Sequence, residues 1–248
     1  MGVIAKERSL VHTSLADYTF MVYGLPKVGK STFCASIPDA YFLAFEAGLK
    51  ALSVYKSPTD KDCFGSYEEF VDVAKSLAQT SHGYKTIVFD TVTAAYELAV
   101  THVCKKNNVS SLADLEYGRG WAMARDALRR PILGLQRAGL RLVFICHEEI
   151  KSTFVFNNEV TVYQPEWNGK QCKQIVYPMV DMIGYMYLKN ARRGNEMVNA
   201  RHLTFTQTPH LVAGDRTGKL EGVEHVIEPK ESGWAIIENY FNRQETEQ

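Results

Sequence analysis

A glycine-rich segment offers the clearest chemistry in the sequence. Residues 24–31 read GLPKVGKS, which fits the spacing G-x-x-x-x-G-K-[ST] of phosphate-binding loops, and they stand between an apolar run and a helix pattern. Glycines at the first and sixth positions let the backbone curl so that its N–H groups surround a phosphate chain. We therefore predict that ATP is bound here by Gly24, Leu25, Pro26, Lys27, Val28, Gly29, Lys30, Ser31 and Thr32.

Two side chains of this loop and one distant acid have predicted roles toward the phosphates and Mg²⁺. Lys30 would reach the β- and γ-phosphates, and Ser31 would be a ligand of Mg²⁺. Asp90 ends the apolar run TIVFD and looks like a Walker B aspartate, which holds Mg²⁺ through water. Alternatively, Asp90 begins the next helix as its N-cap, and the two roles could coexist.

Two further polar residues follow apolar runs and are candidates for the hydrolysis step. Thr91 stands after Asp90 where many ATPases carry a glutamate, so the base that activates water must lie elsewhere. Glu46 ends the run AYFLAF and is the predicted base, while His147 ends the run LRLVFIC and is the predicted sensor of the γ-phosphate. The alternatives are a solvated loop acid for Glu46 and a structural role for His147.

The elements that must position these residues alternate between strand and helix patterns. Nearly continuous apolar runs, typical of strands covered on both faces, predict strands at 18–23, 40–45, 86–89 and 140–146, with further strands at 179–188 and 201–206. Helix patterns occupy 31–37, 66–79, 94–105, 120–137 and 233–242. This alternation predicts an α/β fold with a mostly parallel central sheet flanked by helices, in a single domain over residues 1–248.

The composition limits the classes of partner. The chain of 248 residues has 28 Lys and Arg against 28 Asp and Glu, so any contact with nucleic acid must come from local patches. No apolar run approaches the ~18 residues that a membrane-spanning helix needs. We expect a cytoplasmic protein with no membrane partner.

Four segments together resemble a known family. The segments GLPKVGKS, FLAFEAGLKAL, TIVFDTVTAA and LVFICHEE resemble the RecA-like recombinase ATPases, most closely the small phage-encoded single-strand annealing ATPases, over about residues 16–220. The resemblance implies a RecA-like core in which Glu46 is the catalytic base, His147 is the γ-phosphate sensor and Thr91 follows the Walker B Asp90. Large flanking domains of the full recombinases are missing from this pattern.

The resemblance also implies two mobile DNA-binding loops, near 105–120 and 148–171. The second loop mixes aromatic and basic side chains suited to stacking bases and neutralising phosphates, namely Lys151, Phe154, Phe156, Trp167 and Lys170. In the alternative interpretation this segment is a β-hairpin in which TFVF pairs with EVTVY.

Other basic residues have more than one possible role. Six arginines between Arg119 and Arg141 could form a DNA footprint, a subunit interface or a solvated helix face. The resemblance implies that a basic residue after the strand RHLTF reaches the γ-phosphate of a neighbouring subunit, and we assign this role to Arg216, with Lys219 second. A plain turn closed by Gly218 is the alternative.

These features together predict an ATPase that works on DNA. We expect an ATP-dependent protein that binds single-stranded DNA in phage homologous recombination or strand annealing, with ATP hydrolysis stimulated by DNA. We expect the protein to assemble with copies of itself into a ring or filament and to contact a single-strand DNA-binding protein. The alternative is a P-loop NTPase of another class, such as a nucleotide-gated assembly module or a small-molecule kinase, without DNA binding.

Overall fold

A mostly parallel sheet occupies the centre of the computed structural model, which describes residues 12–155, 158–193, 196–228 and 231–243. Its strands are β1 (Phe20–Gly24), β2 (Ala40–Ala44), β3 (Tyr55–Ser57), β4 (Thr86–Asp90), β5 (Arg141–Val155), β6 (Asn158–Pro165), β7 (Met182–Arg193), β8 (Glu196–Thr204), β9 (Gly214–Asp215) and β10 (Glu224–Ile227). The order is β10-β8-β7-β1-β5-β4-β2-β3, with β6 paired to β5 and β9 paired to β7. The strands from β7 to β3 are parallel to one another, and β8 pairs antiparallel with both of its neighbours, β7 and β10.

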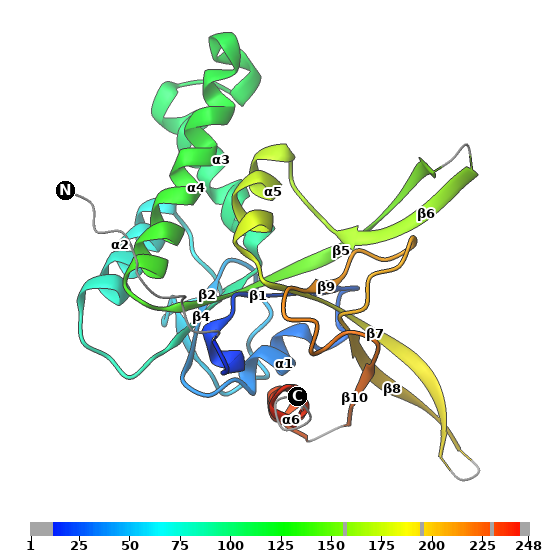
Figure 1. Cartoon of the computed structure of the whole chain (residues 1–248). Helices are drawn as coiled ribbons and strands as arrows, with labels where there is room; N and C mark the ends of the chain where they lie inside the picture. The colour runs from blue at the N-terminus through cyan, green and yellow to red at the C-terminus, as the bar shows by residue number, and fades with distance from the viewer. Residues whose placement is uncertain (1–11, 156–157, 194–195, 229–230, 244–248) are drawn as a thin grey trace, which may run out of the picture.

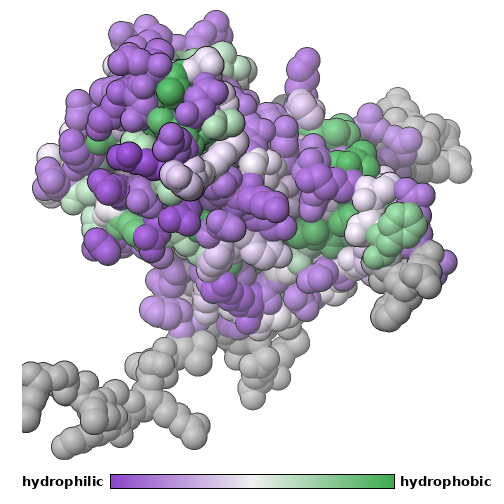
Figure 2. Space-filling view, turned by 90° about the horizontal axis from the view of Figure 1, so that it is seen from above, coloured by the Kyte–Doolittle hydropathy of each residue, from purple (hydrophilic) through white to green (hydrophobic). Residues whose placement is uncertain are grey.

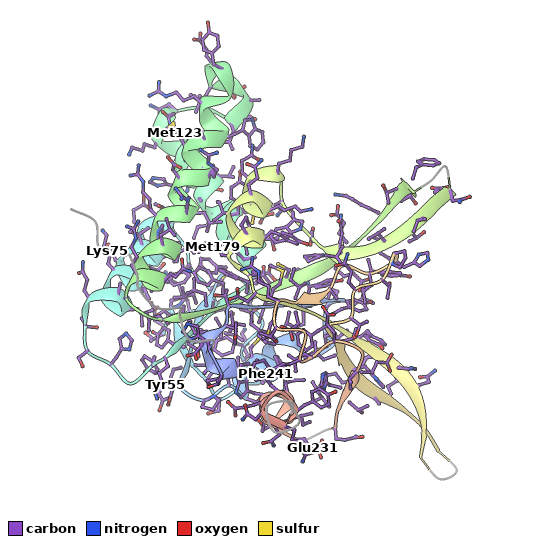
Figure 3. The ribbon with its side chains drawn as sticks, in the orientation of Figure 1. Tyr55, Lys75, Met123, Met179, Glu231 and Phe241 are labelled. Atoms are coloured by element: carbon purple, nitrogen blue, oxygen red, sulfur yellow. The ribbon has the colours of Figure 1, made fainter. Side chains whose placement is uncertain are left out.

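Helices cover both faces of this sheet (Figure 1). They are α1 (Lys30–Ala35), α2 (Tyr67–Gln79), α3 (Val92–Asn107), α4 (Arg119–Arg137), α5 (Lys170–Val176) and α6 (Gly233–Arg243), with 3₁₀ turns at Leu15–Asp17, Leu112–Asp114, Glu116–Gly118 and Tyr177–Met179. The helices α2, α3, α4 and α5 lie on one side, and α1 and α6 lie on the other, where Phe241 packs (Figures 1 and 3). The predicted α/β fold class is confirmed.

The alternation of side chains along β1 explains the two layers. Met21 and Tyr23 point into the core shared with α2, α3 and α4, whereas Phe20 and Val22 point into the core shared with α1 and α6. All five residues of β1 and of β4 are buried, because each strand lies between two neighbours and under two helical layers. This double burial is why these strands are nearly continuous apolar runs in the sequence.

The start of α2 shows how an N-cap residue determines where a helix begins. The Ser66 hydroxyl accepts a hydrogen bond from the Glu69 N–H at 3.2 Å, as a helix N-cap does, and the helix follows directly. The Glu69 carboxylate accepts from the Gly65 N–H at 3.1 Å rather than from Ser66, so only half of a capping box is formed. The predicted helix 66–79 therefore agrees with the observed one to within one residue.

Three projections extend from this core. The helical pair α3 and α4 rises from one side of the sheet, and the hairpins β5–β6 and β7–β8 extend from another (Figure 1). The hairpin alternative for the second loop at 148–171 is confirmed for most of its length, because Glu148 to Val155 pair in register with Pro165 to Asn158. The expected first loop contains the end of α3 and two 3₁₀ turns leading into α4.

Among the described residues, no helix has both the length and the apolarity to cross a membrane.

Candidate nucleotide site

The segment GLPKVGKS forms a tight loop between β1 and α1, as the motif predicts. Gly24 has φ 155° and Gly29 has φ 102°, backbone conformations that favour glycine. A Cβ atom at Gly24 would collide with the Met186 carbonyl oxygen, so the first glycine is required by close packing on β7. Val28 is buried, whereas Leu25, Pro26, Lys27 and Thr32 are exposed.

Lys30 lies inside this loop. Its ammonium donates hydrogen bonds to the carbonyl oxygens of Gly24 at 2.8 Å and Leu25 at 2.9 Å. Burial lowers the pKa of Lys30, and the nearby charge of Asp90 opposes this effect. The ammonium is thus held over the concave side of the loop, where a phosphate could replace the two carbonyl oxygens as its partner.

Ser31 and Asp90 meet at the carboxyl end of β4. The Ser31 hydroxyl donates a hydrogen bond to Asp90 Oδ2 at 2.8 Å. Burial raises the pKa of Asp90, which is only 7% exposed. A buried carboxylate beside a hydroxyl is a fitting pair of oxygen donors for Mg²⁺, because a cation would compensate the charge that burial destabilises.

The N-cap alternative for Asp90 is wrong. The N-cap of α3 is Thr91, whose hydroxyl oxygen accepts from the Ala94 N–H at 3.4 Å. The Asp90 carboxylate points to Ser31 instead, while its backbone carbonyl accepts from the N–H groups of Phe45 at 2.8 Å and Glu46 at 3.3 Å. The end of β4 therefore fixes the backbone of the residue that follows β2.

Glu46 is bound by two polar side chains, and its own side chain is 40% exposed. Its carboxylate accepts a hydrogen bond from the Thr91 hydroxyl at 2.5 Å and lies 3.2 Å from His147 Nε2. The hydrogen bond with His147 is the largest cause of a lowered pKa for Glu46, and that with Thr91 acts in the same direction against burial. Glu46 is therefore held as a carboxylate in a fixed orientation.

His147 extends β5 to the height of the phosphate loop, because it pairs in register with Gly24 of β1. Its Nε2 faces Glu46, and its Nδ1 is buried with no hydrogen-bond partner among the described residues. The four predicted groups thus gather at the carboxyl edge of the sheet: Asp90 ends β4, His147 lies on β5, Glu46 follows β2, and Lys30 begins α1 after the loop that follows β1.

Arg216 and Lys219 lie away from this site in their own subunit. Arg216 follows β9, where Asp215 pairs with Met182 at the start of β7, at the end of the sheet opposite the phosphate loop. Its guanidinium forms a 2.9 Å salt bridge with Asp181. The Lys219 ammonium lies 4.3 Å above the centre of the Phe241 ring. A role for either residue across a subunit interface stays a prediction.

The predicted DNA-contact residues are distributed over two elements. Lys151 and Phe154 are exposed on β5 in the β5–β6 hairpin, whereas Phe156 lies outside the described residues. Trp167 packs against the core and, edge-on, against Tyr177, and Lys170 is exposed at the start of α5. Figure 2 shows apolar patches on the side of the molecule that carries the hairpins. In the β5–β6 hairpin, Ile150 is also exposed.

The arginine-rich segment also divides into two parts. Five arginines are exposed on α4, whose outer end is marked by Met123 in Figure 3: Arg119, Arg125, Arg129, Arg130 and Arg137. Arg141 instead begins β5, donates to the Thr86 hydroxyl and lies 4.5 Å from the centre of the Trp234 ring. The segment is therefore not one continuous footprint, because Arg141 contributes to the core.

Sequence reasoning missed two residues of the site. Thr91 was recognised only as the residue after Asp90, although its hydroxyl binds Glu46. Arg201 of β8 reaches the loop, where its Nε donates to the Val28 carbonyl oxygen at 2.6 Å. No local pattern marks Arg201, because the contact joins residues that are 173 positions apart.

Comparison with known proteins gives three findings. A family model described as an AAA domain matches residues 16–217. The SPbeta prophage-derived uncharacterized protein YorG of Bacillus subtilis (strain 168) is 28% identical over 145 residues, which are 56% of this chain and 43% of that protein. The matched region thus spans less than half of YorG. The crystal structure of the KaiC-like protein PH0186 from Pyrococcus horikoshii OT3 has a TM-score of 0.48 and 11% identity, with 86% of each chain covered.

Proposed function

The chain belongs to the AAA domain family, and from this premise we propose that it is a P-loop ATPase of the RecA-like type that hydrolyses ATP with Mg²⁺ and binds single-stranded DNA. We propose further that it acts in phage homologous recombination or strand annealing. The observation that carries the hydrolysis is the Glu46 carboxylate, which Thr91 and His147 hold at the same sheet edge as Lys30.

Each side chain at this edge has a defined task in the proposed reaction. Lys30 leaves its loop carbonyls and binds the β- and γ-phosphates. Glu46 orients a water molecule toward the γ-phosphate and accepts its proton, and its lowered pKa keeps the carboxylate in the ionised form that this role needs. His147 lies against Glu46 and beside Gly24, where it can respond to the γ-phosphate.

Mg²⁺ would be held by the Ser31 hydroxyl and, through water, by Asp90, and when bound it neutralises charge on the phosphates. The proposal is supported by the position of Asp90 at the end of β4 beside Ser31 and by burial, which disfavours its charge and raises its pKa.

We expect the Asp90→Asn variant to lose the Mg²⁺-dependent part of ATP binding. The amide keeps the shape of the carboxylate but removes the charge that attracts the cation. Calorimetric titration with ATP, with and without Mg²⁺, measures the effect: the two affinities should differ in the parent protein and become similar in the variant. A variant that retains the full Mg²⁺ effect would contradict the assignment of Asp90.

The DNA part of the proposal is supported by the continuity of β5. This strand runs from the core through His147 into the β5–β6 hairpin, so a response at the γ-phosphate can be passed along one strand. The hairpin presents Phe154, which is 74% exposed, and Lys151, which is 57% exposed, and such aromatic and basic side chains stack on bases and neutralise phosphates. The prophage origin of YorG supports the phage setting.

Assembly into a ring or filament is part of the same proposal. Arg216 lies at the end of the sheet opposite its own phosphate loop and is bound to Asp181. We therefore propose that it acts at the nucleotide of a neighbouring subunit. A single-strand DNA-binding protein is the partner we propose for the recombination reaction, since both proteins would occupy the same strand.

We expect the Phe154→Ala variant to bind single-stranded DNA about 5- to 100-fold more weakly, because stacking of one base contributes about 1–3 kcal/mol. Fluorescence anisotropy with a labelled oligonucleotide and a non-hydrolysable ATP analogue measures this change. Tyr55→Ala is the matched control, since Tyr55 is also an exposed aromatic residue but lies on β3 at the far edge of the sheet. If Phe154→Ala binds DNA as tightly as the parent, the exposed arginines of α4 become the leading DNA site.

A further inference from the structure

The phosphate loop is contacted by a second cationic side chain besides Lys30, the guanidinium of Arg201 on β8. Its Nε donates to the Val28 carbonyl oxygen at 2.6 Å, and a Cβ atom at Gly29 would collide with the guanidinium. The guanidinium therefore lies directly on the second glycine of the loop. Glycine is favoured at this position by the positive φ, and its lack of a side chain also lets the guanidinium approach the backbone closely.

The strand register explains why a residue so late in the chain reaches the loop. The pairing of β7 with β1 ends at Tyr23 and Tyr185, after which β7 continues past the end of β1. Arg201 lies opposite Leu188 in the β7–β8 ladder and therefore stands on the part that passes the loop. Its side chain shares the sheet face of Leu203, which packs in the core with α1.

The charges around the loop leave Arg201 available to an anion. Within the described part of the chain, Arg201 forms no salt bridge, and its Nε bond to Val28 leaves the Nη groups without a protein partner. The edge also carries the acids Asp90 and Glu46, which a single Lys30 does not balance. Guanidinium groups bind phosphate oxygens with several N–H donors at once.

We propose that Arg201 is a phosphate-binding residue of the nucleotide site, supplied by β8 of the same subunit. The inference rests on the proposed ATP binding and adds a second cation to Lys30. The phosphate chain would lie between the loop N–H groups and the Arg201 guanidinium. The competing interpretation is a structural one, in which Arg201 only holds the Val28 carbonyl.

The variant Arg201→Gln separates these two interpretations, because glutamine keeps an N–H donor for Val28 but loses the charge. We expect its affinities for ATP, ADP and tripolyphosphate to fall about 10- to 100-fold, as for loss of a hydrogen bond between charged groups. The affinities should also depend less on salt concentration. Arg201→Lys keeps the charge and should retain more affinity than Arg201→Gln. Lys189→Gln is the matched control, since Lys189 lies on β7 and is bound to Glu224.

Calorimetric titrations at two salt concentrations, run below the melting temperature of each variant, give a clear decision. Weaker binding of all three ligands by Arg201→Gln, with Lys189→Gln unchanged, supports the proposal. Parent-like affinity and salt dependence in Arg201→Gln would overturn it, as would an equal loss in Arg201→Lys and Arg201→Gln. Failure of the parent protein to bind ATP would instead refute the proposed function itself.

Discussion

Glu46→Gln should retain ATP binding and lose ATP hydrolysis by about 10²–10⁴-fold, the usual contribution of a general base. The amide preserves the size of the side chain and can still contact Thr91 and His147, but it cannot accept a proton from water. Single-turnover hydrolysis of radiolabelled ATP measures the chemical step directly, and calorimetry on the same sample shows whether binding is preserved.

A surface acid provides the control for this experiment. Asp62→Asn makes the same chemical change at an exposed side chain that forms a 2.9 Å salt bridge with Lys50, and its hydrolysis rate should match that of the parent. Hydrolysis near the parent rate in Glu46→Gln would show that another group activates the water. The hydrogen bonds of Glu46 would then have only a structural role.

Lys30→Ala should reduce ATP affinity by about 100-fold or more, which places binding beyond ordinary assay concentrations. The substitution removes a cation that would form charge-assisted hydrogen bonds with two phosphates, each worth about 1.5–3 kcal/mol. Equilibrium titration with a fluorescent ATP analogue measures the loss. The fold should persist, because the ammonium is bonded only to the carbonyl oxygens of Gly24 and Leu25 at the nearby end of β1 and forms no bond with a distant segment.

The control for Lys30→Ala removes the same charge elsewhere. Lys75 is exposed on α2, on the helical side of the molecule (Figure 3), and Lys75→Ala should bind ATP like the parent. Circular dichroism spectra and melting curves of both variants should resemble those of the parent. Unchanged ATP affinity in Lys30→Ala would contradict the phosphate-loop interpretation of GLPKVGKS.

Most residues at the sheet edge around the phosphate loop could be predicted, because short sequence patterns identify them. The spacing of Gly24, Gly29 and Lys30 identifies the loop, and polar residues directly after apolar runs identify Asp90, Glu46 and His147. In a parallel sheet the carboxyl ends of the strands share one edge, so these residues had to be neighbours. The structure adds how they contact one another, including the bonds of Glu46 to Thr91 and His147.

The features that sequence reasoning missed depend on contacts between distant segments. Arg201 reaches Val28 only because β7 and β8 extend past the end of β1, which no local pattern encodes. The sequence alone does not distinguish the β5–β6 hairpin from a loop, because short alternating runs also fit a loop rich in aromatic residues. Trp167 was assigned to DNA contact by composition, whereas its ring packs against the core.

ATP hydrolysis by the parent protein, measured with Mg²⁺ in the presence and absence of single-stranded DNA, tests the central claim most directly. The proposed function predicts Mg²⁺-dependent turnover that rises when single-stranded DNA is added and that is lost in Glu46→Gln under both conditions. Turnover that is unaffected by DNA would favour a P-loop NTPase of another class, and ATP binding without any turnover, with or without DNA, would contradict the account of Glu46 and His147 as a hydrolytic site.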